Sequence, residues 1–331
     1  MSQLEILIAE SRGFSSEAIE RLRRLGRVVA ADLDRRELHF AVQDADVLWV
    51  RLRNRIDGRV MDAAPRLRLI VTSTTGLNHI DTIEAERRRI GVLSLRDVAS
   101  QLTDVRATAE LTLALMLCIL RNLPAANRCA LRGPCDRLAF RGAEISGKTI
   151  GLVGYGRLGR MVARYLLAMH ARVLVSERPG WQGALDDGVS LVAIEELLKR
   201  SDIVSLHANL STESRGFFNA ACFRAMKPGA WFVNTARGEL VDEKALLEAL
   251  ESGRLAGAAL DVLCDEQTTN LTRHPLVRYA RRRGNLLLTP HIGGCTRESM
   301  ERTELMLTAR LEQMIASGLP ASLCSTAGNA G

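Results

Sequence analysis

The sequence predicts an α/β protein built from two doubly wound parallel-sheet domains. Three observations predict this fold. A chain of 331 residues exceeds the usual size of one hydrophobic core. Short apolar runs alternate with amphipathic helical stretches, and a glycine-rich turn directly follows the run at residues 149–153. Buried parallel strands with covering helices produce such an alternation.

The first hundred residues predict one open parallel sheet. Apolar runs typical of buried strands lie at residues 4–9, 47–50, 67–71 and 92–95. Helical patterns between them include residues 16–25 and 83–89. A long helix is expected over residues 104–120. The following segment, residues 128–147, is rich in glycine, proline and arginine and is expected to be irregular.

The pattern is sharper in the second half of the chain. Strands are expected at residues 149–153, 172–176, 203–207, 231–233, 257–260 and 286–289. Helices are expected at residues 158–169, 194–199, 244–251 and 298–315, the last of which can pack back on the first domain. This alternation predicts a second doubly wound unit.

The positive charge of the chain does not indicate a nucleic-acid partner. The formal net charge of +7 comes almost wholly from arginine, since the only lysines are Lys148, Lys199, Lys227 and Lys244. Arginine clusters such as residues 87–89 and 281–283 are scattered and lack interleaved aromatic residues. Such a pattern predicts solvated surfaces and no nucleic-acid binding.

Cysteine spacing and hydropathy predict a cytoplasmic protein. The seven cysteines are dispersed without paired metal-ligand spacing, so we expect reduced thiols, no disulfide framework and no metal site. Glu5 interrupts the first apolar run before a signal peptide can develop. The most apolar stretch, residues 111–120, has about half the length of a membrane span, so we expect a buried helix and no membrane partner.

The glycine-rich turn has the G-x-G-x-x-G spacing of a dinucleotide-binding loop. It follows an expected strand and opens an expected helix, and this context makes the match specific. The first glycine allows a tight turn, the second lets the backbone approach a pyrophosphate, and the third allows close helix packing. The expected cofactor-binding residues are Gly154, Tyr155, Gly156, Arg157, Leu158 and Gly159.

An acidic residue in the expected position supports binding of NAD. Glu177 ends the next strand, where its carboxylate can accept hydrogen bonds from the adenosine ribose hydroxyls and disfavours a 2′-phosphate. Arg178, beside it, could help to tolerate NADP, so the cofactor preference stays open at this point.

Several further motifs occur together along the chain. They are TGLNHID at residues 75–81, ATAE at 107–110, SDIVSLH at 201–207, MKPGAWFVNTARGELVD at 226–242, GAALDV at 257–262 and LTPHIGG at 288–294. Together they resemble the D-isomer-specific 2-hydroxyacid dehydrogenases over nearly the whole chain. The resemblance implies NAD as cofactor and a small 2-hydroxy or 2-keto acid as substrate.

The resemblance also implies a domain arrangement. A Rossmann cofactor domain, residues 100–289, would be inserted into a flavodoxin-like substrate domain made of residues 1–99 and 290–331. The active site would lie in the cleft between the domains. The long helix and the irregular arm after residue 128 resemble the segments through which this family forms homodimers.

On this resemblance the catalytic residues are Arg237, Glu266 and His291. The guanidinium fork of Arg237 can hold the substrate carboxylate and polarise the adjacent keto oxygen. His291 can supply a proton when hydride adds to the carbonyl and remove it in the reverse direction. Glu266 would hold the imidazole and favour its protonated form. The family usually has proline after this glutamate, whereas this chain has Gln267, and Asp265 is a neighbouring competitor for the role.

The remaining site residues follow from the same motifs. Asp261 would accept a hydrogen bond from the nicotinamide carboxamide, although it could instead cap a loop. Further expected cofactor contacts are His207, Thr235, Ala236 and Gly293, together with Arg237 and His291. Backbone N–H groups of Thr75, Gly76 and Leu77 would take the substrate carboxylate as an anion-binding turn.

Two alternatives remain at this stage. Arg53, together with Arg51 and Arg55, could reach a second anionic group, which would favour a phosphoglycerate dehydrogenase-like specificity. A non-enzymatic corepressor that senses NAD, like the C-terminal-binding proteins, would share the same motifs. The sequence does not name the substrate.

Overall fold

The structure is a computed structural model that describes residues 3–266 and 270–317. Within these residues the chain forms two compact units. The first contains the chain up to Val105 and the segment from Thr296, and the second contains Arg106–Cys295. The domain boundaries expected from the sequence, after residues 99 and 289, lie slightly earlier in the chain than the boundaries between these two units. The assignment of substrate and cofactor binding to these units stays a prediction, and residues 318–331 of the expected substrate domain lie outside the described residues.

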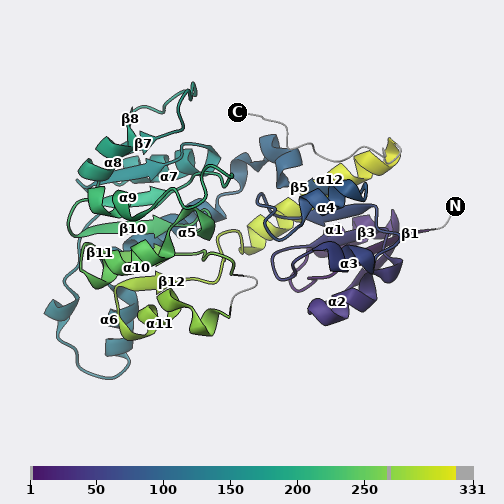
Figure 1. The fold of residues 1–331 in the computed structure, drawn as a ribbon, viewed down its shortest axis with the longest axis horizontal. Coiled ribbons are helices and arrows are strands. Elements are labelled where there is room, and N and C mark those ends of the chain that lie inside the picture. The colour runs from purple at the N-terminus through teal and green to yellow at the C-terminus, as the bar shows by residue number, and fades with distance from the viewer. Residues whose placement is uncertain (1–2, 267–269, 318–331) are drawn as a thin grey trace. The chain divides into compact units, whose positions relative to one another are not determined.

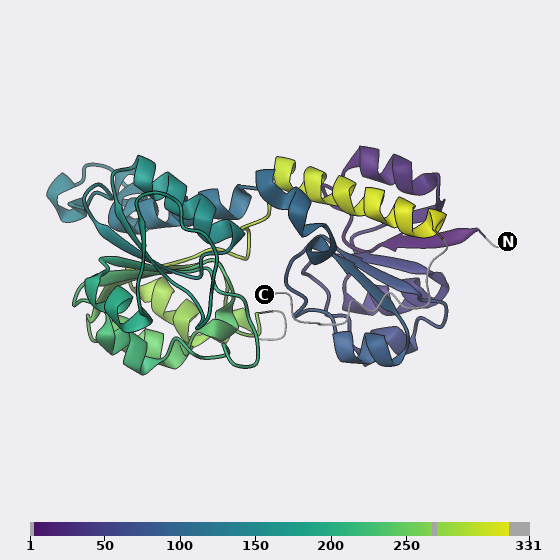
Figure 2. The ribbon, with the colours of Figure 1, turned by 90° about the horizontal axis from the view of Figure 1, so that it is seen from above.

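The first unit is built on a five-stranded parallel sheet with the order β2-β1-β3-β4-β5. Its strands are β1 (Leu4–Ile8), β2 (Gly26–Ala30), β3 (Val47–Val50), β4 (Leu69–Thr72) and β5 (Gly91–Ser94). One face packs against α1 (Ser16–Arg23), the 3₁₀ helix η2 (Leu95–Asp104) and α12 (Arg297–Ala316). The other face packs against α2 (Arg35–Ala41), the 3₁₀ helix η1 (Val42–Asp44), α3 (Gly58–Asp62) and α4 (Thr82–Arg87). Figure 2 shows these three layers.

The second unit is built on a seven-stranded parallel sheet with the order β12-β11-β10-β9-β6-β7-β8. Its strands are β6 (Thr149–Val153), β7 (Arg172–Ser176), β8 (Val189–Leu191), β9 (Ile203–Leu206), β10 (Ala230–Asn234), β11 (Leu255–Leu260) and β12 (Leu286–Leu288). One face packs against α5 (Ala107–Leu120) and α7 (Arg157–Ala168). The other packs against α8 (Ile194–Arg200), α9 (Ala220–Ala225), α10 (Glu243–Glu251) and α11 (Pro275–Arg282), as Figure 1 labels them.

These two sheets confirm the predicted fold class. Strand β6 is buried along its whole length because helices cover both faces of the sheet, and this explains why it contains no charged residue. The strand order reverses at β6, which pairs with β7 on one side and β9 on the other. Ligands of such sheets bind outside the carboxyl ends of the strands at this reversal. The loops after β6, β7, β9, β10 and β11 carry most of the candidate site residues.

The second unit also contains shorter elements. They are α6 (Leu123–Ala130) and the 3₁₀ helices η3 (Arg137–Phe140), η4 (Gly238–Leu240) and η5 (Leu271–Arg273). No single helix in the described part of the chain has the length and apolar character needed to cross a membrane. Only α5 and α6 taken together do, and they are bent by 62° relative to each other.

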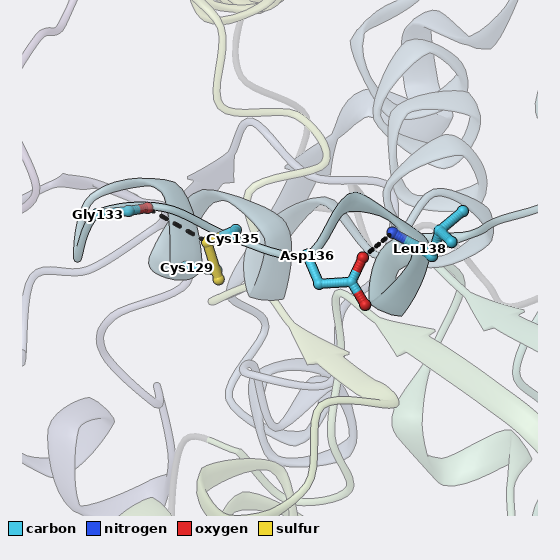
Figure 3. Close-up of a disulfide and its surroundings, with 5 residues drawn as sticks. All are labelled: Cys129, Gly133, Cys135, Asp136 and Leu138. Carbon is cyan, nitrogen blue, oxygen red and sulfur yellow. Dashed lines mark hydrogen bonds between the residues drawn. A yellow bond between two sulfur atoms is a disulfide. The ribbon is translucent and has the colours of Figure 1, made fainter.

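The prediction that the cysteines stay reduced is wrong for one pair. Cys129, in α6, and Cys135 form a disulfide (Figure 3), with Cα atoms 6.0 Å apart. The pairing depends on the path of the backbone, because α6 ends at Ala130 and the chain turns back through Gly133, whose φ is +126°. The free cysteines among the described residues are Cys118, Cys222, Cys264 and Cys295, and Cys324 lies outside the described residues.

Candidate active site

The glycine loop after β6 has the backbone geometry that a dinucleotide requires. Gly154 has a φ of +101°, and a Cβ there would lie 2.6 Å from the carbonyl carbon of His207. A Cβ on Gly159 would lie 2.3 Å from the carbonyl oxygen of Gly154. Only glycine therefore allows the turn and the close approach of α7 to the strand.

The N-terminus of α7 is open at Gly156. Gly156 is the N-cap of α7, and a Cβ on it would meet no described atom within 4 Å. Backbone N–H groups at a helix N-terminus attract anions, so this open approach suits the pyrophosphate of NAD. Arg157 and Leu158 begin the helix, and burial lowers the pKa of the Arg157 guanidinium.

Glu177 lies beside this loop, as expected for a ribose-binding carboxylate. Its carboxylate accepts hydrogen bonds from the backbone N–H of Tyr155 and, at 3.2 Å, from that of Arg178. The Tyr155 ring is buried, and its hydroxyl donates to Asp186 at 2.6 Å. Contact of Glu177 with the ribose stays a prediction, but the carboxylate is held next to the loop that would bind the pyrophosphate.

His207 supports the glycine loop from the end of β9. Its backbone N–H donates to the carbonyl of Val153 at 2.7 Å, and its Nε2 lies 3.0 Å from Oγ of Ser205. Burial lowers the pKa of His207 to about 4, so its ring is neutral near pH 7. The structure therefore shows His207 in contact with the glycine loop.

Asn234 shapes the loop that carries Arg237. Its side-chain oxygen accepts from the Ala236 N–H at 2.9 Å, and its side-chain amide donates to the Arg237 carbonyl at 2.8 Å. Thr235 is buried, and its hydroxyl lies 2.8 Å from that of Thr112 in α5. Arg237 therefore leaves β10 on a rigid turn, partly exposed to solvent. The positioning role of Asn234 was missed, although an asparagine closing a strand is a signal for such a turn.

The structure brings Glu266 and His291 together. Oε1 of Glu266 is hydrogen-bonded to Nδ1 of His291. The second oxygen, Oε2, accepts from the backbone N–H of Leu263 at 3.1 Å. The side chains of the pair are 22% and 23% exposed, so the ring can be reached by a small molecule. Asp265 contacts Cys264, with 3.7 Å between Oδ2 and Sγ.

Asp261 holds the loop that contains His291. One oxygen accepts from the Thr289 hydroxyl at 2.6 Å and the Ile292 N–H at 2.9 Å, and the other accepts from the Gly293 N–H at 2.8 Å. His291 itself has a φ of +52°, and its N–H donates to the Asp261 carbonyl at 2.8 Å. Burial raises the pKa of the Asp261 carboxyl. In the structure Asp261 therefore caps the loop that carries His291, and its contact with the nicotinamide stays a prediction.

Gly238 brings the loop of Arg237 close to the loop of Glu266. A Cβ on Gly238 would lie 2.1 Å from the carbonyl carbon of Leu263. The backbones of the two loops are therefore in direct contact. Arg237, Glu266 and His291 all belong to the second unit, so their arrangement depends on one folded body.

The expected carboxylate-binding turn lies in the first unit. The Thr74 hydroxyl donates to the Gly76 carbonyl at 2.7 Å, and Nε of Arg96 donates to the Thr75 carbonyl at 2.8 Å. These bonds shape residues 75–77 as a turn after β4. Binding of substrate by their N–H groups stays a prediction.

Arg51 and Arg53, two of the three arginines after β3, have different surroundings. Arg51 forms an ion pair with the fully buried Glu304 of α12, and its Nη1 donates to the Arg12 carbonyl at 2.9 Å. Arg51 is thus committed to the packing of the first unit. Arg53 is half-exposed and lies 3.7 Å from Asp32, and its binding of a second anionic group stays a prediction.

Comparisons with known proteins identify the family of the chain. Residues 113–293 match the family model described as D-isomer specific 2-hydroxyacid dehydrogenase, NAD binding domain. A glyoxylate reductase from Thermofilum pendens is 37% identical over 295 residues, which cover 87% of this chain and 84% of that protein. A D-3-phosphoglycerate dehydrogenase from Mycobacterium tuberculosis is 36% identical over 283 residues, which cover 84% of this chain but only 51% of that protein.

A solved structure shares the fold of the chain. The TT0316 protein from Thermus thermophilus has a TM-score of 0.80 and 34% sequence identity, with 95% of this chain and 97% of that chain covered. The family model covers more than half of the chain, and its description includes binding of NAD. The chain therefore belongs to the D-isomer-specific 2-hydroxyacid dehydrogenases, a family of NAD-dependent oxidoreductases.

Proposed function

We propose that this protein interconverts a D-2-hydroxy acid and its 2-keto acid, with His291 as the acid and base, Glu266 as its partner and Arg237 as the carboxylate-binding residue. The hydrogen bond between Glu266 and Nδ1 of His291 carries this proposal. A carboxylate on Nδ1 fixes the orientation of the ring and makes Nε2 the nitrogen that exchanges a proton.

Each residue has a defined task in the reduction of the keto acid. The nicotinamide of NADH supplies the hydride when it is bound. Arg237 holds the substrate carboxylate through two parallel N–H···O bonds, which orients the carbonyl carbon. His291 donates its Nε2 proton to the carbonyl oxygen, and Glu266 stabilises the charged imidazole before that transfer. In the oxidation direction neutral His291 removes the hydroxyl proton.

The surroundings of the arginines support a small substrate without a second anionic group. Arg51 is paired with Glu304, and Arg53 has Asp32 nearby, so neither is dedicated to a phosphate. The Thermofilum pendens relative, named a glyoxylate reductase, is matched over most of its length. We therefore place glyoxylate and hydroxypyruvate first among the candidate substrates.

The same proposal includes a homodimer. The segment around the disulfide carries large apolar side chains that are exposed in this single chain, namely Leu123, Leu131 and Leu138. Exposed apolar residues gathered in one segment are typical of a protein interface. A measured mass of one chain in light scattering would contradict the dimer.

A substrate panel tests the proposed reaction. NADH oxidation is followed with glyoxylate, hydroxypyruvate, phosphohydroxypyruvate and pyruvate, with His291→Ala as the matched control. We expect the highest kcat/KM with one of the two small acids named above and a loss of activity in the control. A rate that is unaffected by His291→Ala would contradict the assignment of the acid and base.

A further inference from the structure

Glu243 makes contacts that its place in helix α10 does not require. It is the first residue of α10, but the helix N-terminus is capped by Asp242, whose side chain accepts from the N–H groups of Lys244 and Ala245, both at 3.1 Å. The Glu243 carboxylate points to other partners. Its Oε1 accepts from the backbone N–H of Cys264 at 2.8 Å, and its Oε2 lies 3.0 Å from Nε2 of His274.

This group of residues is largely buried. The side chains of His274 and Glu243 are 9% and 17% exposed. Burial raises the pKa of the Glu243 carboxyl, which means that removing this group from water costs free energy. A hydrogen-bonded carboxylate in such a place constrains its partners strongly, because the alternative is an unsatisfied buried acceptor.

The partner of Glu243 is the loop that carries Glu266. Cys264 lies two residues before Glu266, and the adjacent Leu263 N–H donates to Oε2 of Glu266. The same loop packs against the backbone of Gly238. Glu243 and Gly238 therefore hold the loop at neighbouring points, and Glu266 extends from it toward His291.

We infer that Glu243 is a positioning residue for catalysis, which holds the 263–266 loop so that Glu266 stays on Nδ1 of His291. His274 contacts the other oxygen of the Glu243 carboxylate, Oε2, and so helps to orient it. This inference rests on the proposed function of Glu266. Glu243 would affect catalysis by positioning Glu266, without contacting the substrate itself.

A double-mutant cycle tests the inference. The variants are Glu243→Ala, Glu266→Gln and the double variant, with the exposed Glu248→Ala on the same helix as the matched control. Misplacement of a catalytic group by about 1 Å costs on the order of 10²-fold in rate, so we expect kcat of Glu243→Ala to fall by about 10- to 100-fold. We expect its KM for NADH to stay unchanged.

The pH profile separates positioning from a purely structural role. In Glu243→Ala the alkaline limb of kcat/KM for reduction should move to lower pH, as in Glu266→Gln, because His291 loses its carboxylate partner in both. In the double variant the limb should move no further than in Glu266→Gln alone. Glu243→Gln keeps an oxygen that can accept from the Cys264 N–H, so it should restore most of kcat.

Several outcomes would overturn the inference. An unshifted limb in Glu243→Ala, or a further shift in the double variant, would show that Glu243 does not act through Glu266. If Glu243→Ala does not fold, Glu243→Asp replaces it, because its shorter side chain withdraws the carboxylate from Cys264 and should shift the limb in the same way. An unshifted limb in Glu266→Gln itself would instead refute the proposed role of Glu266, and the inference with it.

Discussion

Glu266 and His291 are 25 residues apart in the sequence, and the structure joins them through a hydrogen bond between Oε1 and Nδ1. Replacing Glu266 by Gln removes the negative charge and preserves much of the shape. Because the charge stabilises the protonated ring, the alkaline limb of kcat/KM for keto-acid reduction should move to lower pH. The activating limb for hydroxy-acid oxidation should move in the same direction, since the proposed oxidation needs neutral His291.

The measurement is a pair of pH–rate profiles, taken where chemistry is rate-limiting. His291→Ala provides the reference, because loss of proton transfer typically costs about 10²–10⁴-fold. If the profiles of Glu266→Gln coincide with those of the parent protein, another residue is the partner of His291. Asp265 would be the first residue to test.

Arg237→Lys should lose much more activity than a charge-conserving change suggests. Lysine is a point charge on a flexible chain and cannot form the two parallel hydrogen bonds of a guanidinium with a carboxylate. Steady-state kinetics with the preferred keto acid should show a large drop in kcat/KM. Near-normal turnover with lysine would remove Arg237 from the active site.

Glu177 should make the enzyme prefer NADH to NADPH in kcat/KM, because its carboxylate repels a 2′-phosphate. Glu177→Gln keeps an acceptor for the Tyr155 N–H and removes the charge, so it should narrow the preference. The kcat/KM values for NADH and NADPH are measured at low ionic strength, where the repulsion between the carboxylate and the 2′-phosphate is least screened. Equal use of the two cofactors by the parent protein would show that Arg178 dominates.

Arg53 should matter only for a substrate with a second anionic group. Arg53→Ala should weaken kcat/KM for phosphohydroxypyruvate and leave that for glyoxylate nearly unchanged, since Arg53 is the half-exposed arginine beside the paired Arg51. The exposed Arg36→Ala serves as the control for a general loss of positive charge. An equal response of both substrates, or of neither, would refute this role.

His207 should make the protein less stable in acid. Its pKa is about 4 in the folded protein and 6.5 in its ordinary state, so between these values the unfolded chain takes up a proton that the folded chain does not. The contribution of neutral His207 to stability is fully present well above pH 6.5 and is lost as the pH falls from 6.5 toward 4. At pH 5 the loss amounts to about 2 kcal/mol in the free energy of unfolding.

Urea unfolding at pH 7.5 and pH 5 measures this loss. His207→Gln should lose less stability between the two pH values than the parent protein, whereas the exposed His39→Gln should lose as much as the parent. The same pH dependence in all three proteins would show that His207 titrates normally in the folded state.

The strands that the sequence did not reveal lie at the edges of the sheets. Apart from the last strand, 286–289, the expected strands of the second unit are internal to its sheet, and their short runs of mainly apolar residues predicted them. Strands β2 and β8 were missed. Each is an edge strand with exposed residues, so its sequence lacks the apolar run that burial on both faces requires.

The α/β class, the glycine loop and the motifs of the family could be predicted from the sequence, because each depends on residues that are close together in the chain. The pairing of individual side chains could be seen only in the folded protein. Cys129 forms a disulfide with Cys135, Arg51 forms an ion pair with Glu304, and Asp261 holds the loop of His291 by hydrogen bonds. The Glu243 carboxylate accepts a hydrogen bond from the Cys264 N–H. Such pairs depend on how helices and loops pack over the sheets, and the spacing of residues along the chain carries little information about that packing.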